Sequence, residues 1–344
     1  MRFGLGQFTL QIPPWDNRTH ADLYADTLEL AAWAEDAGFD SFWLAEHHGA
    51  SDGYNPSPLP FLSAVAARTR RIELGTAVLL APFHNPLRIA EDAAVVDNIS
   101  GGRLNLGLGL GWAPEEYRMF GAEHKGRGKR LAEFAQVLKR AWTQERFTFE
   151  GEHYSYDDVS ITPKPARAGG PPIWLGGSAD AALRRSARFG DGYFPPSMSG
   201  YDSLPDLAQK MVSLRNDLNP NAPYRFGAFQ NVGIGDDEDD AWRSIRDGVM
   251  HVRGAYMLWG QGARDVSGAR EAAEPFEDQI RDGCIVGTPQ QVAAKMRSSI
   301  EKIDTLGFDD AVVSVILAPP GTPAERAREA VDRFARDVIP ALRS

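Results

Sequence analysis

The sequence predicts an α/β fold, a single (β/α)8 TIM barrel spanning residues 1–344 as one domain. Short apolar runs with strand character alternate with segments of helical spacing along the whole chain. The turns between them are short, which predicts parallel strands joined by right-handed crossovers. Eight strands can be counted, which is the number that closes such a barrel, and the length of 344 residues leaves room for insertions.

In chain order, the strands are predicted at residues 3–8, 41–45, 72–78, 103–110, 172–177, 191–194, 224–233 and 310–317. The helices between and after them are predicted at residues 22–38, 56–69, 85–101, 129–143, 178–189, 201–218, 236–252, 288–306 and 323–338. Gly38 stands where a helix commonly ends in a left-handed residue, and Pro86 and Pro289 suit a first helical turn. Residues 147–156 predict a short hairpin insertion, and the glycine- and charge-rich segment near 260–282 predicts a mobile insertion.

Composition limits the partners and the compartment. The 47 acidic and 37 basic residues give a net charge of −10, which argues against nucleic acid as a main partner. We expect no membrane span, because no run of about 18 apolar residues occurs, and the apolar part of the N-terminus is too short for a signal peptide. The single cysteine, Cys284, excludes an intramolecular disulfide, so we expect a cytoplasmic protein.

One predicted strand, Ser41–Ala45, runs directly into Glu46, His47 and His48. Ionisable groups at a strand end must be hydrated, paired or used, and this end of a parallel barrel is where active sites form. The segment therefore indicates an acid–base or cofactor-orienting cluster, with a surface turn as the alternative. We expect no metal, because adjacent residues on an extended segment point to opposite sides and no close-spaced histidine pair occurs elsewhere.

A stripe of small residues marks the fourth predicted strand. Asn105, Gly107, Gly109 and Gly111 share one face, where barrels normally place branched side chains. We expect the stripe to leave a slot for a flat ring, although glycines can also mark bulges or close packing. The run Gly176–Asp180 then ends a strand in two glycines and begins a helix at Ser178, which suits a phosphate but also fits a plain helix cap.

The segments AEHHG, IELGTAV, NPLRIAEDAAVVDNISGGRLNLGLGLGW, KGRGKRLAEF, PPIWLGGSADAALRRSARFGDGY and CIVGTPQQVAAKM together resemble the bacterial luciferase-like flavin monooxygenases. The resemblance covers nearly the whole chain in order. It implies a (β/α)8 barrel that binds reduced FMN or a deazaflavin at the carboxyl ends of the strands. The FMN-dependent members insert oxygen into small organic substrates.

Carried over by position, the resemblance makes His47 the reactive histidine and Glu46 an acid near the flavin. It places a non-proline cis peptide at Ala77–Val78 and makes Ser178 a phosphate contact. The implied cofactor contacts are Glu46, Ala77, Val78, Asn105, Gly107, Gly109, Gly177, Ser178 and Ala179. Leu110 replaces the arginine that grips phosphate in luciferase, and Gly177 replaces a glutamate, so we expect this chain to hold the phosphate differently.

These observations predict an FMN-dependent monooxygenase that uses reduced FMN from a separate flavin reductase, together with O2 and a small organic substrate. The catalytic residues would be His47 and Glu46. The resemblance also implies a homodimer. The alternatives are a deazaflavin-dependent oxidoreductase that transfers hydride, a non-catalytic flavin-binding subunit, and a metal-dependent hydrolase.

Overall fold

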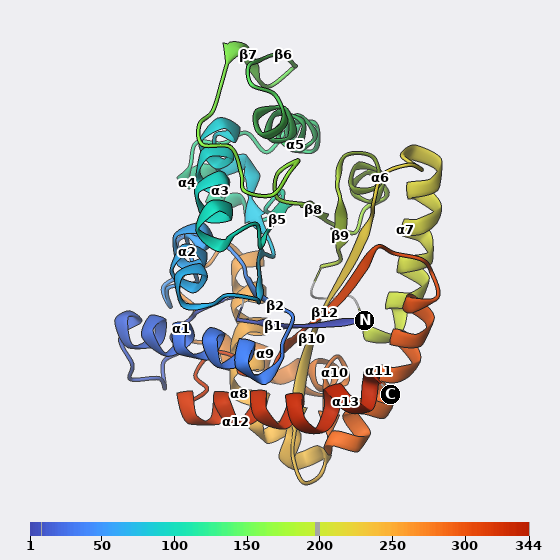
Figure 1. Cartoon of the computed structure of the whole chain (residues 1–344). Coiled ribbons are helices and arrows are strands. Elements are labelled where there is room, and N and C mark those ends of the chain that lie inside the picture. The colour runs from blue at the N-terminus through green and yellow to red at the C-terminus, as the bar shows by residue number, and fades with distance from the viewer. Residues whose placement is uncertain (8, 197–199, 344) are drawn as a thin grey trace.

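A ring of eight parallel strands forms the centre of the computed structural model, which describes residues 1–7, 9–196 and 200–343 (Figure 1). In order round the ring these are β1 (Arg2–Gly6), β2 (Ser41–Leu44), β3 (Glu73–Thr76), β5 (Leu104–Gly109), β8 (Ile173–Gly176), β9 (Gly192–Phe194), β10 (Arg225–Ile234) and β12 (Asp310–Ile316). Since β12 pairs in parallel with β10 and β1, and β10 also pairs in parallel with β9, the ring closes. Each strand overlaps one predicted from the sequence, so the barrel prediction is confirmed; the first strand ends at Gly6, and Phe8 lies outside the described residues.

Helices cover the outside of the ring. They are α1 (His20–Ala37), α2 (Pro58–Arg68), α3 (Pro86–Ser100), α5 (Arg127–Thr143), α6 (Asp180–Phe189), η2 (Tyr201–Ser203) with α7 (Leu204–Leu218), α11 (Pro289–Asp304), and α12 (Ala324–Arg333) continued by η4 (Phe334–Val338) and α13 (Ile339–Arg343). Local chemistry sets their ends. Thr19 and Asp22 form a capping box at the start of α1, and Gly38 ends that helix at φ 95°. Among the described residues, no helix combines the length and apolar character needed to cross a membrane.

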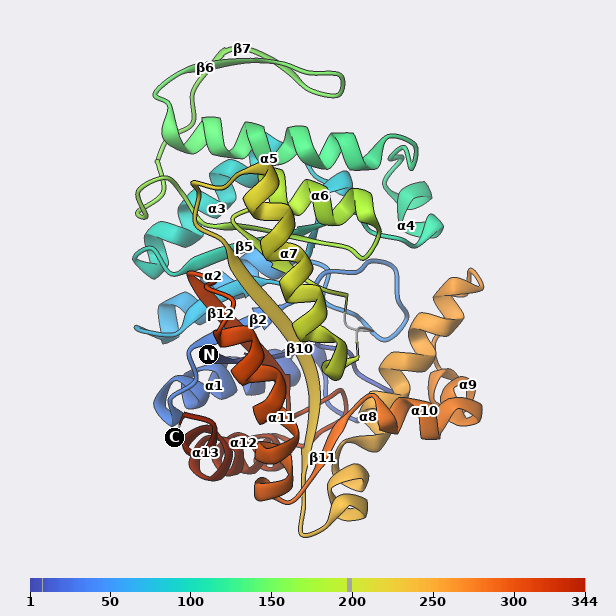
Figure 2. The ribbon, with the colours of Figure 1, turned by 90° about the vertical axis from the view of Figure 1, so that its right-hand side faces the viewer.

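Two insertions extend the barrel. The hairpin of β6 (Phe147–Glu150) and β7 (Ser155–Val159) was predicted, and it lies at the periphery beyond α5 (Figures 1 and 2). The second insertion follows β10 and consists of α8 (Glu238–Gly260), α9 (Ala269–Ala273), η3 (Glu274–Phe276), α10 (Glu277–Asp282) and β11 (Ile285–Gly287). In Figure 2, α8, α9 and α10 stand to one side of the barrel.

The second insertion differs from its prediction. Helix α8 continues past the predicted end at Val252 to Gly260, and the segment expected to be mobile is largely helical. Ala269 is fully buried in one cluster with Trp259, and Ile280 is buried in another, so these short helices pack against apolar residues of α8. Two further elements near the barrel mouth, β4 (Leu79–Leu80) and α4 (Pro114–Met119), were also not predicted.

Large aromatic side chains fill the barrel lumen beneath its mouth. Trp43, Trp174 and Phe194 are almost fully buried and contact one another at ring-centroid distances of 4.8–5.7 Å. Glycines on neighbouring strands make room for them, since a Cβ at Gly75 would overlap the Trp43 ring and one at Gly192 would overlap Trp174. The lower barrel is therefore a packed core, and any ligand must bind above it.

Candidate active site

A cavity of about 560 Å³ lies at the carboxyl ends of the barrel strands. Most of the residues expected at the site line it: Glu46, His47, Ala77, Val78, Gly109, Gly177, Ser178 and Ala179. The peptide bond between Ala77 and Val78 is cis, as the resemblance implied. The strand ends thus bring together residues that are far apart in the sequence.

Two expected contacts lie elsewhere. Asn105 is buried below the cavity, where its amide donates to Glu73 (2.9 Å) and its carbonyl accepts from the indole of Trp174 (3.1 Å). Gly107 does not line the cavity either, because a Cβ at this position would overlap the carbonyl oxygen of Thr76. Both positions serve packing within the barrel rather than the cavity wall.

The expectation that the glycine stripe leaves an open slot was therefore wrong. Gly107 allows the backbone of β3 to approach β5, and Thr76 Oγ1 donates to the Gly107 carbonyl at 2.8 Å. Gly109 does border the cavity, but the space beside it holds the Val78 side chain, which a Cβ at Gly109 would overlap. The missing side chain at Gly109 makes room for Val78, and both residues border the cavity.

His47 is held by a carboxylate that the sequence analysis did not identify. Its Nδ1 donates to Oε1 of Glu116 on α4 at 2.8 Å, and the same oxygen accepts the backbone N–H of His48 at 2.8 Å. Glu116 has no exposed surface. Because Oε1 acts as an acceptor, Nδ1 of His47 carries a proton, and Nε2 forms no hydrogen bond to a described residue. Nε2 is therefore the ring nitrogen that can exchange a proton with a molecule in the cavity.

Aromatic rings surround the His47 imidazole at 4.9–6.3 Å: Tyr54, Trp112, Tyr256 and Trp259. The last two come from α8, so the insertion builds one wall of the site. The Tyr54 and Tyr256 hydroxyls lie 3.2 Å apart. Burial raises the pKa of Tyr256 to about 12 and that of Tyr54 well above its usual value, so both phenols stay protonated.

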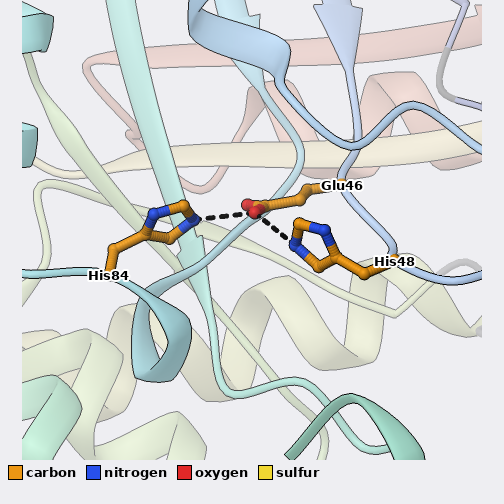
Figure 3. A group of neighbouring side chains, drawn as sticks. All are labelled: Glu46, His48 and His84. Carbon is orange, nitrogen blue, oxygen red and sulfur yellow. Dashed lines mark hydrogen bonds and ion pairs between the residues drawn. The ribbon is translucent and has the colours of Figure 1, made fainter. Parts of the chain in front are cut away.

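Glu46 forms a hydrogen-bonded triad with His48 and His84 (Figure 3). Its Oε1 accepts from Nε2 of both histidines at 2.7 Å, and its Oε2 accepts the backbone N–H of Leu80 at 2.7 Å. Burial alone would raise the pKa of Glu46, but the hydrogen bonds and charges of the two histidines lower it to about 2. The three ligand atoms lie within 4.8 Å of one another. However, each Nε2 must carry a proton to make its bond, so the hydrogen bonds account for the cluster without a metal.

The opposite end of the cavity has the character of an anion site. Gly177, Ser178 and Ala179 lead into α6, and Gly177 has φ 122° with a would-be Cβ only 2.7 Å from that of Ala182. Backbone N–H groups and the positive end of a helix gather here. Ser178 was expected to begin the helix, but the N-cap is Ala179 and no side chain caps it, so the Ser178 hydroxyl is not used as a cap.

Two arginines, Arg127 on α5 and Arg185 on α6, lie near these residues, and neither was among the predicted site residues. Arg127, at the start of α5, lines the cavity and contacts His124. Arg185 on α6 passes close to Gly128, where a Cβ would lie 2.8 Å from its guanidinium. The buried Nε of Arg185 has no partner in the described part of the chain, and burial together with the charge of Arg127 lowers the pKa of Arg185. Neither arginine forms an ion pair with a carboxylate in the described part of the chain, so the two cations fit a phosphate. They would take the place of the luciferase arginine that Leu110 replaces.

The sequence profile described as luciferase-like monooxygenase matches residues 3–310. The chain belongs to this family. It is 29% identical over 350 residues to 4-hydroxyprotoasukamycin monooxygenase of Streptomyces nodosus subsp. asukaensis, covering 98% of this chain and 92% of that protein. It is also 32% identical over 331 residues to F420-dependent glucose-6-phosphate dehydrogenase of Amycolatopsis mediterranei (strain U-32), covering 93% of this chain and 95% of that protein.

Among solved structures, the monooxygenase RslO1 from Streptomyces bottropensis superposes with a TM-score of 0.78 at 27% identity, covering 99% of both chains. The luciferase-like family thus includes oxygen-using and F420-using relatives of this chain. In both groups the enzyme is an oxidoreductase, and so is this protein.

Proposed function

We propose that the protein is a flavin-dependent monooxygenase that binds reduced FMN and uses O2 to oxidise a small organic substrate. One observation carries this proposal: a single cavity joins the His47–Glu116 pair to an anion site at residues 177–179 and Arg127. FMN carries an isoalloxazine ring and a phosphate tail, and it would need the His47 part of the cavity for the ring and the anion site for the phosphate. When bound, reduced flavin would supply the two electrons that activate oxygen.

The residues of the cavity have defined roles in this proposal. Backbone N–H groups at Gly177–Ala179, the Ser178 hydroxyl and the two arginines would hold the phosphate, while Ala77, Val78 and Gly109 would border the ring. His47 would accept or donate a proton at Nε2, with Glu116 fixing its orientation. Glu46 would be an anion in the resting site beside the ring and would orient the ring through its hydrogen bonds.

The walls of the cavity also suit oxygen chemistry. Trp259 and Tyr54 are almost fully buried beside His47, and Trp112 stacks against Tyr256 with ring centroids 5.8 Å apart. Such a wall of rings excludes water, which protects reactive oxygen species from unproductive breakdown. The same rings would favour an apolar or aromatic substrate.

A deazaflavin-dependent oxidoreductase is the second candidate, favoured by the 32% identity to an F420-dependent dehydrogenase. Titration with FMN, reduced FMN and F420, followed by turnover under air and under nitrogen, separates the two. We expect reduced FMN to bind and oxygen to be consumed when a flavin reductase is added. Anaerobic turnover with F420, and none with FMN, would select the second candidate.

The proposal includes a separate flavin reductase, a cytoplasmic location and a homodimer, with the whole chain acting as one domain. Val95 and Ile99 on α3 support the dimer, because they are apolar and 44% and 49% exposed on the outside of the barrel. A charged substitution at Ile99 should then yield monomers in sedimentation analysis. No separate site for a nucleic acid, membrane or metal forms part of the proposal.

A further inference from the structure

The Glu46–His48–His84 triad links a residue that lines the cavity to a partly exposed side chain that does not line it. Glu46 lines the cavity and its side chain has no exposed surface, and the side chain of His48 is 8% exposed. The His84 side chain is 27% exposed. The hydrogen bond between His84 and Glu46 (Figure 3) therefore connects a partly exposed imidazole to a carboxylate that lines the cavity.

The protonation pattern of the triad suits proton transfer. Oε1 of Glu46 is an acceptor, so His84 carries its proton on Nε2. Its Nδ1 forms no hydrogen bond to a described residue and belongs to the most exposed side chain of the three. The imidazole can therefore take up a proton from water at one nitrogen while it releases another to Glu46 at the other.

We propose that His84 is the point at which a proton from solvent enters the cavity, with Glu46 as the carrier into the interior. This proposal rests on the proposed function, since oxygen reduction adds negative charge that a proton must neutralise. A proton from water adds to Nδ1 of His84 as the Nε2 proton passes to Oε1 of Glu46. Glu46 then passes that proton to a basic group bound in the cavity, such as the reduced oxygen, and becomes a carboxylate again. The imidazole ends neutral and returns to its first tautomer by exchange with water, and no electron moves.

The low pKa of Glu46 does not prevent this relay. With a pKa of about 2, the protonated carboxyl is populated to about one part in 10⁵ at pH 7. Multiplied by the barrier-free rate of about 6 × 10¹² per second, this still allows about 6 × 10⁷ transfers per second. Typical enzymes turn over at about 1–10³ per second, so the carrier is fast enough.

The path is separate from the His47–Glu116 pair. His48 packs against the rings of Phe83 and Phe120, with centroids at 5.9 and 4.5 Å. Glu116 reaches the backbone of His48 and not its imidazole. Glu46 is thus the member through which a proton from His84 can reach the cavity.

The test uses the full chain loaded with FMN, reduced without oxygen and then mixed with air-saturated buffer in a stopped-flow spectrometer. His84→Gln can keep a hydrogen bond to Glu46 but cannot carry a proton, and His84→Ala opens the path to small bases. We expect both to slow flavin reoxidation at least about tenfold, with an increased solvent isotope effect. Added imidazole should restore His84→Ala but not His84→Gln. His153→Ala, in the peripheral hairpin, should match the unaltered protein.

The outcomes separate this proposal from the proposed function. If the unaltered protein did not bind reduced FMN, the proposed function would fail, and this proposal with it. If it bound and reoxidised FMN but His84→Gln reacted at the same rate, only the relay would be wrong. A slow His84→Ala that imidazole did not restore would mean a structural role for His84 and would likewise overturn the relay.

Discussion

Nδ1 of His47 lies 2.8 Å from Oε1 of Glu116, although the two residues are separated by 69 positions in the sequence. Glu116 belongs to α4, a helix of six residues above the mouth of the barrel. It fixes the tautomer of His47 and also binds the backbone of His48. The acid–base group of the cavity is therefore a pair built from two elements, and its properties depend on the placement of α4.

Replacing Glu116 should impair chemistry more than flavin binding. An amide in Glu116→Gln stabilises a charged His47 poorly and can present the wrong group to Nδ1, so we expect product formation to fall about 10- to 100-fold. Glu115→Gln is the matched control, because Glu115 is adjacent and pairs only with Arg118 among the ion pairs of the described chain. Steady-state assays and FMN titration measure the two effects. If Glu116→Gln and Glu115→Gln were equally active, Glu116 would have no role in catalysis.

The anion site predicts a dependence on the flavin phosphate. Arg127→Gln should weaken FMN binding about 10- to 100-fold, because a charge-assisted hydrogen bond to phosphate is worth about 1.5–3 kcal/mol. Riboflavin lacks the phosphate, so its affinity should not change. Arg130→Gln on the same helix is the control, since Arg130 faces Glu123. Fluorescence titration of both flavins provides the readout, and equal losses for FMN and riboflavin would argue against a phosphate contact.

The close contact between β5 and Val78 predicts a stability effect. Gly109→Ala should destabilise the protein by about 1–3 kcal/mol, because the new Cβ overlaps the Val78 side chain. Combining it with Val78→Ala should restore part of this loss. Gly260→Ala, where a Cβ meets no atom within 4 Å, should be close to neutral. Denaturant unfolding measures all three, and an equal stability of the Gly109 and Gly260 variants would contradict the packing described.

The pKa of Glu46 predicts how stability depends on pH. Its folded-state pKa of about 2 lies below the ordinary value of 4.5, so the ionised group contributes stability above pH 4.5 that is lost as the pH falls towards 2. The shift corresponds to about 3 kcal/mol. The difference in unfolding free energy between the unaltered protein and Glu46→Gln should therefore be constant near neutral pH and shrink below pH 4.5. A difference that stays constant down to pH 2 would show that Glu46 is not held in this way.

The barrel could be predicted because its signals are local. Strand and helix periods, caps such as Thr288 and Pro289, and the run of Glu46 and His47 after β2 can each be read from neighbouring residues. The long-range pairs could not, since nothing in the spacing of the sequence connects His47 with Glu116 or Glu46 with His84. The sequence shows only an acid on a short helix after a glycine-rich strand, and a histidine before Asn85–Pro86. Neither feature indicates which residue is its hydrogen-bond partner.

The glycine stripe shows a second limit. A missing side chain indicates close approach, but the sequence does not say whether a ligand or another strand occupies the space. At Gly107 and Gly109 the occupant is the chain itself, through Thr76 and Val78. The same ambiguity applied to Ser178, which could have been a plain cap and is not.

Titration of the purified protein with reduced FMN, riboflavin and F420, coupled to oxygen uptake in the presence of a flavin reductase, tests the central claim most directly. The cavity geometry predicts tight binding of reduced FMN, weaker binding of riboflavin, and oxygen consumption that His47→Ala uncouples from product. Tight F420 binding with anaerobic turnover, and no binding of reduced FMN, would contradict it.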